Sequence, residues 1–406
     1  MFRHTLPYRP LYFLSALGAG GLMVSVFMYF MFLVPHPDTP MPTFSHLADV
    51  FAHGSVLSIV LVSIAIAAIV LLAVLHFILL TVNLRAHFKF RRTEDFQKLL
   101  SSNGEVTLMA IPLTLAMTIN VLFVGGAIGV PGLWNHVESL FPFSLAGFAA
   151  VGIYALAVFG RYLTRIMSST EFNSEDTNHF SQILPSFTFS MVAVGFAAPA
   201  AMSHNITVSA LGMVGAFLFA SASVIWAMIN LPVSMGMILR KGMAKEAGPT
   251  LWIGIPILTL LGITFVRVGS GLGHNFLGGV NLSPPLTLVV LGLFLTAQVL
   301  MGLLGWSIMH RQRYFSDYVF GDKKSIATYG LACPGVAFCV LSMFFLDWGL
   351  VRTEVLVKYT APHITLVVLA GVVQVVTIAL ILKLNNRLYG GSATKTDAKV
   401  KKSETP

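Results

Sequence analysis

The sequence has 406 residues, of which 56% are hydrophobic and only 10% are charged. Soluble domains carry roughly 25% charged residues, so this composition excludes a water-soluble globular protein and places the chain in lipid. The net charge of +9 suggests nucleic-acid binding only where basic residues cluster on a soluble face, and here they lie between apolar stretches. We therefore expect a membrane protein without a nucleic-acid partner.

Apolar stretches long enough to cross a bilayer, roughly 20 residues each, recur along the chain. The first begins after Arg3, His4 and Arg9 and lacks a small-residue cleavage site, so we interpret it as a retained span. The predicted spans are residues 11–34, 55–83, 106–128, 141–163, 184–202, 207–230, 249–268, 285–309, 325–347 and 362–384. The sequence thus predicts an all-α, ten-span membrane domain over 1–388 and a disordered cytoplasmic tail over 389–406.

Basic residues separate the two sides of the membrane. Of the 25 Lys and Arg residues, 22 fall in the termini and in alternate connections, and only Arg267, Arg352 and Lys358 fall on the other side. The positive-inside rule then places both termini in the cytoplasm and requires an even number of spans. We expect a multi-pass protein of a bacterial inner (plasma) membrane.

Helix-weakening residues concentrate in the odd-numbered spans. They are Gly18 in the first span, Pro112 in the third, Pro185 and Pro199 in the fifth, Pro256 in the seventh and Pro334 in the ninth. Proline inside a helix frees a carbonyl, which in lipid needs a partner or a water-filled cavity. The alternation favours five helical hairpins in a ring, with odd helices lining a central pore. The alternative is that proline and glycine are simply commoner in membrane helices.

Ionisable groups are nearly absent from the predicted spans. Carboxylates such as Glu105, Glu138 and Asp347 fall at span ends or in loops, and no Lys or Arg is predicted at mid-membrane. Coupled transporters and pumps usually place Asp, Glu or His there, so the pattern favours a passive, uncharged path. Helix N-termini, freed amides and Ser or Thr hydroxyls attract anions to such a path.

Catalytic and cofactor chemistry has little support in the sequence. Cys333 and Cys339 fall on different helix faces, which disfavours both a disulfide and a metal site. His76 is the one histidine clearly within a predicted span, whereas a buried b-type haem needs two facing ligands. No Ser, His and Asp combination suited to hydrolysis is predicted at depth. We expect no enzyme activity, no metal and no cofactor.

The segment GPTLWIGIP at residues 248–256 opens the predicted seventh span. It resembles the "PTL-aromatic-I" start of the seventh span in the tellurite-resistance/C4-dicarboxylate transporter (TDT) family, which includes the plant guard-cell slow anion channels. Further similarities are Tyr12-Phe13 with Leu17-Gly18 in the first span, Asn103 with Pro112 in the third, and Tyr329 to Pro334 in the ninth. The resemblance extends over the whole hydrophobic region.

The resemblance implies a homotrimer in which each chain has five inner and five outer helices around a narrow anion path. In the family, a phenylalanine directly before the ninth-span proline blocks the path, and Cys333 occupies that position here. The family register therefore places Cys333 at the pore. A plug would then come from Phe187, Tyr329 or Phe338, with Phe187 as the first choice.

These observations predict a passive channel or uniporter for small anions such as chloride, nitrate, sulfite, a C4-dicarboxylate or a tellurite-like oxyanion. One alternative is a proton-coupled secondary transporter that exports sulfite or an organic acid. A third possibility, from a different class, is a membrane redox or accessory subunit.

Overall fold

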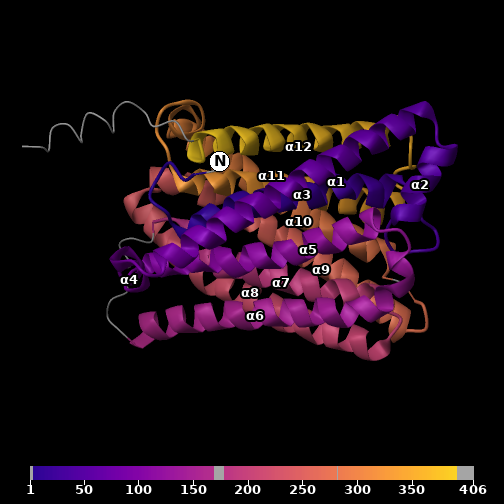
Figure 1. Ribbon diagram of the computed structural model, residues 1–406, viewed down its shortest axis with the longest axis horizontal. Helices are drawn as coiled ribbons and strands as arrows, with labels where there is room; N and C mark the ends of the chain where they lie inside the picture. The colour runs from indigo at the N-terminus through magenta and orange to yellow at the C-terminus, as the bar shows by residue number, and fades with distance from the viewer. Residues whose placement is uncertain (1–2, 169–177, 281, 391–406) are drawn as a thin grey trace, which may run out of the picture.

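A computed structural model describes residues 3–168, 178–280 and 282–390. The described part of the chain is helical and contains no β-strand. Ten of its helices are long and apolar enough to cross a membrane, which confirms the predicted all-α, multi-pass architecture. Most of these helices run along the long axis of the molecule, beside one another (Figure 1).

The odd-numbered spans share one construction, in which a short 3-10 helix leads into an α-helix. They are η1 (Pro10–Tyr12) with α1 (Phe13–Leu33), η2 (Asn103–Met109) with α5 (Ala110–Gly129), η5 (Phe180–Ile183) with α7 (Leu184–Met202), η6 (Lys245–Trp252) with α9 (Gly254–Asn275), and η8 (Ile326–Leu331) with α11 (Ala332–Phe344). Helix α11 continues into the π-helical segment η9 (Phe345–Val351).

The even-numbered spans are longer α-helices. They are α3 (Val56–Phe90), α6 (Val137–Ser168), α8 (Ile206–Lys241), α10 (Pro284–Arg311) and α12 (Ala361–Leu388). The short helix η3 (Leu133–His136) precedes α6, and the π-helical segment η7 (Phe315–Phe320) follows α10. Two short helices, α2 (Phe44–His53) and α4 (Glu94–Leu100), lie at opposite ends of the molecule (Figure 1).

Burial divides the spans into two groups. The most apolar windows of the odd-numbered spans are 50–100% buried, and those of the even-numbered spans only 17–39%. The odd-numbered helices contact one another in a closed ring, in the order α1, α5, α7, α9, α11 and back to α1. We call them the inner ring. Each of them also contacts the even-numbered helix that follows it, so the even-numbered helices carry most of the surface that faces lipid.

Polar side chains on the even-numbered helices tie them to the inner ring. His76 of α3 places Nδ1 2.8 Å from the Ala16 carbonyl and Nε2 3.0 Å from the Thr118 hydroxyl. Gln298 of α10 donates from Nε2 to the Ile255 carbonyl at 2.9 Å. Such bonds between helices satisfy polar groups where lipid offers no partner. Both ring nitrogens of His76 are engaged in this way, so its role is to join α1, α3 and α5.

The prediction that prolines interrupt the bodies of the odd-numbered helices is wrong for three of them. Pro112, Pro256 and Pro334 are each the third residue of an α-helix, directly after its 3-10 turn. Each proline therefore stands at the transition from the 3-10 turn to the α-helix, where its fixed φ suits the first helical turn, and it does not interrupt the body of the α-helix. Pro199 does lie inside α7. Gly18 lies in an uninterrupted α1, where an added Cβ would meet the Ile381 side chain of α12, so it serves close packing.

The two ends of the described chain meet, so that residues before α1 contact the end of α12. The Thr5 amide donates to the Leu388 carbonyl at 3.0 Å. Tyr389, the first residue of the predicted tail, is buried, and its hydroxyl lies 2.7 Å from Ser15 Oγ and 3.0 Å from Asn83 Oδ1. The packed domain therefore extends through this residue. The rest of the predicted tail, from 391 on, lies outside the described residues.

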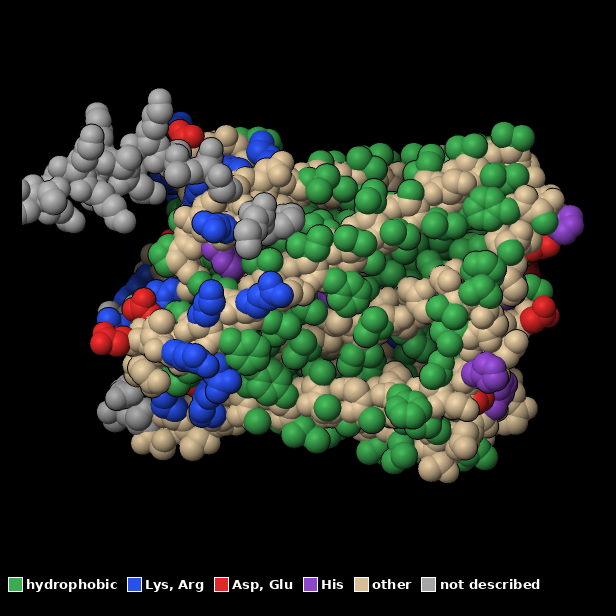
Figure 2. All heavy atoms as spheres, in the orientation of Figure 1, with side chains coloured by type: hydrophobic (Ala, Val, Ile, Leu, Met, Phe, Trp, Pro, Cys, Tyr) green, Lys and Arg blue, Asp and Glu red, His purple; other side chains and the backbone are tan. Residues whose placement is uncertain are grey.

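Charge is unevenly distributed along the molecule. Lys and Arg side chains gather at the end that holds α4 and both ends of the described chain, whereas several histidines lie at the α2 end (Figure 2). We call these the basic end and the α2 end. The odd-numbered helices all begin at the basic end.

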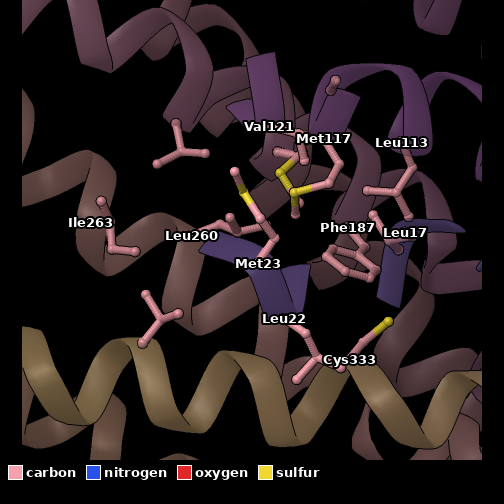
Figure 3. Packing of buried hydrophobic residues seen from close by; sticks show 14 of the residues in the cluster. Leu17, Leu22, Met23, Leu113, Met117, Val121, Phe187, Leu260, Ile263 and Cys333 are labelled. Carbon is pink, nitrogen blue, oxygen red and sulfur yellow. The ribbon is translucent and has the colours of Figure 1, made fainter. Parts of the chain in front are cut away.

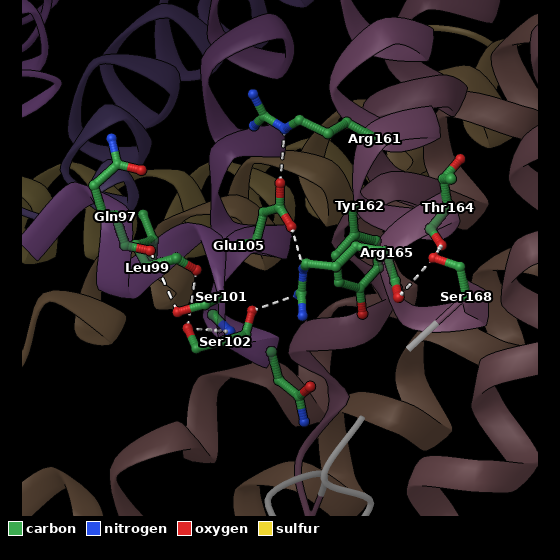
Figure 4. Close-up of polar contacts among 12 residues, drawn as sticks. Gln97, Leu99, Ser101, Ser102, Glu105, Arg161, Tyr162, Thr164, Arg165 and Ser168 are labelled. Atoms are coloured by element: carbon green, nitrogen blue, oxygen red, sulfur yellow. Dashed lines mark hydrogen bonds and ion pairs between the residues drawn. The ribbon is translucent and has the colours of Figure 1, made fainter. Parts of the chain in front are cut away.

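A buried carboxylate joins η2 to α6 at the basic end (Figure 4). Glu105 is 1% exposed, and its two oxygens each accept a 2.8 Å bond, one from Arg161 Nε and the other from Arg165 Nε. The Arg165 side chain is mostly buried and also donates to the Ser102 carbonyl at 2.7 Å, whereas the Arg161 side chain is half exposed. The strength of this cluster therefore depends mainly on Glu105 and Arg165.

We expect Arg165→Gln to destabilise the protein by about 3 kcal/mol, because it leaves the buried Glu105 carboxylate without its better-shielded partner. Arg161→Gln is the matched control and is expected to cost less than about 1 kcal/mol, since exposed ion pairs contribute little. Thermal unfolding in detergent measures both. Equal destabilisation by the two substitutions would contradict this ranking.

Candidate functional site

Three cavities follow one another inside the inner ring. The wide cavity, of about 660 Å³, lies at the α2 end and is lined by the segment after α1, by His274 near the end of α9 and by residues after α11. The central cavity, of about 100 Å³, is lined by all five inner helices. The small cavity, of about 70 Å³, lies at the basic end among the 3-10 turns.

The cavities meet at two sets of shared residues. The wide and central cavities share what we call the arginine junction, formed by Val24, Met28, Asn120, Arg267 and Phe344. The central and small cavities share the phenylalanine junction, formed by Phe187, Pro256 and Cys333. The three cavities therefore follow one another in the order wide, central and small, and the central cavity adjoins both of the others.

Arg267 is the one charged residue among the described residues that line the central cavity. Its Nη1 donates to the Val194 carbonyl of α7 at 3.0 Å, and within the described chain the guanidinium forms no ion pair. A guanidinium carries five N–H donors and a permanent charge, so it can donate several bonds to an anion in the cavity. Asn120 of α5 adds an amide to the same junction.

The sequence did not reveal the role of this residue, because the predicted seventh span ends at 268 and Arg267 was therefore assigned to the loop that connects two spans. Helix α9 instead continues to Asn275. Its glycines stay helical because they pack closely: a Cβ at Gly271 would collide with the Ala200 carbonyl of α7. The signal in the sequence is a lone arginine just before glycines spaced two apart.

The wide cavity carries more positive than negative charge. Among the described residues, its lining includes Arg267, Arg352 and Lys358 but only one carboxylate, Asp347. Arg352 Nε and Lys358 Nζ lie 3.6 and 3.8 Å from the Asp347 carboxylate. Burial lowers the pKa of His36 in the same lining below its usual value, so this imidazole is neutral at pH 7. The cavity therefore attracts anions toward the arginine junction.

The phenylalanine junction joins two of the predicted gate residues. Phe187 of α7 and Cys333 of α11 are both buried and line the central and small cavities. Figure 3 draws them with Leu17 of α1 in the same apolar cluster. The structure thus places an aromatic ring and the cysteine where the central and small cavities meet.

The other two gate candidates lie away from these cavities. Tyr329 is fully buried and donates from its hydroxyl to Asn385 Oδ1 of α12 at 2.9 Å, with its ring near Tyr12. Phe338 is half-buried. Neither is among the described residues that line the three cavities, so neither is placed to plug them. The hydrogen bond of Tyr329 gives it a structural role between η8 and α12.

The small cavity is surrounded by the beginnings of the inner helices. Its lining includes hydroxyl residues of the 3-10 turns, namely Thr107 of η2 and Thr250 of η6, together with Ser181 of η5. No charged side chain is among the described residues of this lining. Helix N-termini carry partial positive charge from their free N–H groups, so this end also favours negative ions.

Comparisons with protein-family models and with curated proteins gave no match for this chain. The fold establishes the class, a multi-pass α-helical membrane protein with a closed inner ring of five helices. The likeness to the TDT family rests on the sequence motifs described above.

Proposed function

We propose that this protein is a passive channel or uniporter for small anions, similar in kind to TDT proteins, and that anions pass through the three cavities in turn. The observation that carries the proposal is Arg267, a single cation between the wide and central cavities. A guanidinium at this position stabilises an anion where it must leave the wide cavity and lose water.

Passive transport fits the lining better than coupled transport does. Among the described residues, no carboxylate lines the central or small cavity, and the carboxylate of the wide cavity, Asp347, is held between Arg352 and Lys358. A proton-coupled transporter usually needs a titratable group where the substrate passes. The central lining is mainly apolar, with Asn120, Thr259 and Arg267 as its polar residues.

Flux measurements in liposomes test this proposal. Protein reconstituted in vesicles should release chloride or nitrate down its gradient at a rate that an imposed pH gradient leaves unchanged. Anion uptake against its own gradient, driven by the pH gradient, would favour the alternative, a proton-coupled exporter of sulfite or an organic acid. Absence of flux for inorganic anions, sulfite and C4-dicarboxylates alike would end the transport proposal. A visible absorption band in purified protein would favour the redox alternative.

The proposal includes the orientation, a bacterial inner membrane with the basic end in the cytoplasm, and assembly as a homotrimer. The support for orientation is the gathering of Lys and Arg at one end of the molecule. The support for the trimer is the family resemblance alone.

We expect a cysteine at Asn135, exposed just before α6, to react with an impermeant thiol reagent added outside cells, and one at Arg91 to react only after permeabilisation. This labelling pattern would show that the basic end faces the cytoplasm. Wild-type protein is the control, because Cys333 and Cys339 are both buried. Labelling of Arg91→Cys but not Asn135→Cys in intact cells would reverse the orientation.

A further inference from the structure

Two histidines converge at the rim of the wide cavity. His204 lies in the turn between α7 and α8, and His274 lies near the end of α9 and lines the cavity. His204 Nδ1 and His274 Nε2 are 2.8 Å apart, with the ring planes inclined by 62°. Both side chains are solvent-accessible.

The backbone that carries each imidazole is held in place by other groups. The carboxylate of Glu138, at the start of α6, accepts from the His204 amide and from the Ser203 hydroxyl, each at 2.7 Å. Asn275, next to His274, donates to the Ser203 carbonyl at 3.0 Å. These bonds fix the backbone that carries each imidazole, and the two rings are joined to one another by the 2.8 Å hydrogen bond between His204 and His274.

This arrangement suits a soft or borderline divalent metal. Zinc–imidazole bonds of 2.0–2.1 Å at a tetrahedral angle hold two nitrogens about 3.3 Å apart. The observed separation needs to widen by only about half an ångström, which exposed side chains allow. Imidazole suits zinc, copper and nickel, whereas magnesium and calcium prefer oxygen ligands.

We infer that His204 and His274 form a two-histidine site for a divalent transition metal, Zn²⁺, Ni²⁺ or Cu²⁺, with solvent in the remaining coordination positions. Deprotonated Nδ1 of His204 and Nε2 of His274 are the ligands. The ion joins the α7–α8 turn to α9 and adds positive charge at the rim of the wide cavity. On α9, Arg267 and His274 are seven residues apart and share a face, so the ion faces the same cavity as Arg267.

Electron paramagnetic resonance with Cu²⁺ as the probe tests the site in the full-length protein in detergent at pH 7.5. One equivalent of Cu²⁺ should give a spectrum with coupling to two imidazole nitrogens, and excess Zn²⁺ should displace it. His204→Gln and His274→Gln should each weaken Cu²⁺ binding at least about tenfold, since even changes outside the ligand shell cost 10–100-fold. His136→Gln, which removes an exposed histidine near the start of α6, is the matched control and should bind normally.

A second measurement uses only the wild-type protein and so is independent of how the variants fold. Zn²⁺ should protect His204 and His274, but not His136, from modification by diethylpyrocarbonate, as read by mass spectrometry of peptides. A Cu²⁺ spectrum that is the same in wild type and in the double variant would overturn the inference, as would equal modification of all three histidines with and without Zn²⁺.

Discussion

Arg267→Gln should lower anion flux by roughly 10- to 100-fold while leaving the protein correctly assembled. Hydrogen bonds to a charged group contribute about 1.5–3 kcal/mol. A passing anion loses this stabilisation at the arginine junction when glutamine replaces Arg267. Glutamine keeps a donor for the Val194 carbonyl, so the contact between α9 and α7 is preserved. Chloride or nitrate efflux from liposomes at fixed protein density measures the effect.

Arg352→Gln is the matched control for this substitution. Arg352 also lines the wide cavity, but it lies beside Asp347 and its guanidinium stacks over the Trp348 ring, 3.4 Å from the ring centroid. In this larger space, water and counterions screen its charge, so we expect less than about a threefold change in flux. Arg267→Lys should give an intermediate flux, since it keeps the charge but loses the planar donor set. Wild-type flux in Arg267→Gln would show that this cation does not carry anion permeation.

The number and class of the spans could be predicted because a long apolar stretch in lipid satisfies its own backbone hydrogen bonds by forming a helix. The inner position of the odd-numbered spans was also detectable, although the physical reason differs from the one first inferred. Pro112, Pro256 and Pro334 mark odd spans because each of those spans begins with a 3-10 turn that leads into an α-helix, and proline fits the first turn. Pro199 does lie inside α7, but Pro142 and Pro232 lie inside the even-numbered α6 and α8, so the position of proline alone does not separate inner from outer helices.

The candidate site was only half predictable, because its parts come together through packing between distant helices. Phe187 and Cys333 were identified from residue type and from the family register. Arg267 was missed because span boundaries are the least certain part of a sequence-based prediction, and the end of α9 depends on close packing of Gly271 against α7. The separation of Phe187 from Tyr329 and Phe338 depends on helix rotation, which the hydrophobicity of uniformly apolar spans does not specify.

Phe187→Ala should raise anion conductance severalfold. The ring lies at the phenylalanine junction, where the central cavity of about 100 Å³ meets the small cavity of about 70 Å³. Removing the ring leaves a void between them that the surrounding helices fill only in part. Because the small cavity is bounded by helix N-termini and hydroxyl residues, the joined space remains suitable for anions. Single-channel or macroscopic current in planar bilayers, per unit of reconstituted protein, measures the change.

Cys333→Phe should lower conductance, because it adds a second ring to the same junction from α11. Phe189→Leu is the control on α7: this ring is 1% exposed and packs against Phe159 of α6 and Phe219 of α8, away from the cavities. Its conductance should match wild type, since leucine fills most of the space in that contact. A gate at this junction requires Phe187→Ala and Cys333→Phe to change current in opposite directions. If both leave it unchanged while the proteins assemble normally, anions do not cross between the central and small cavities at Phe187.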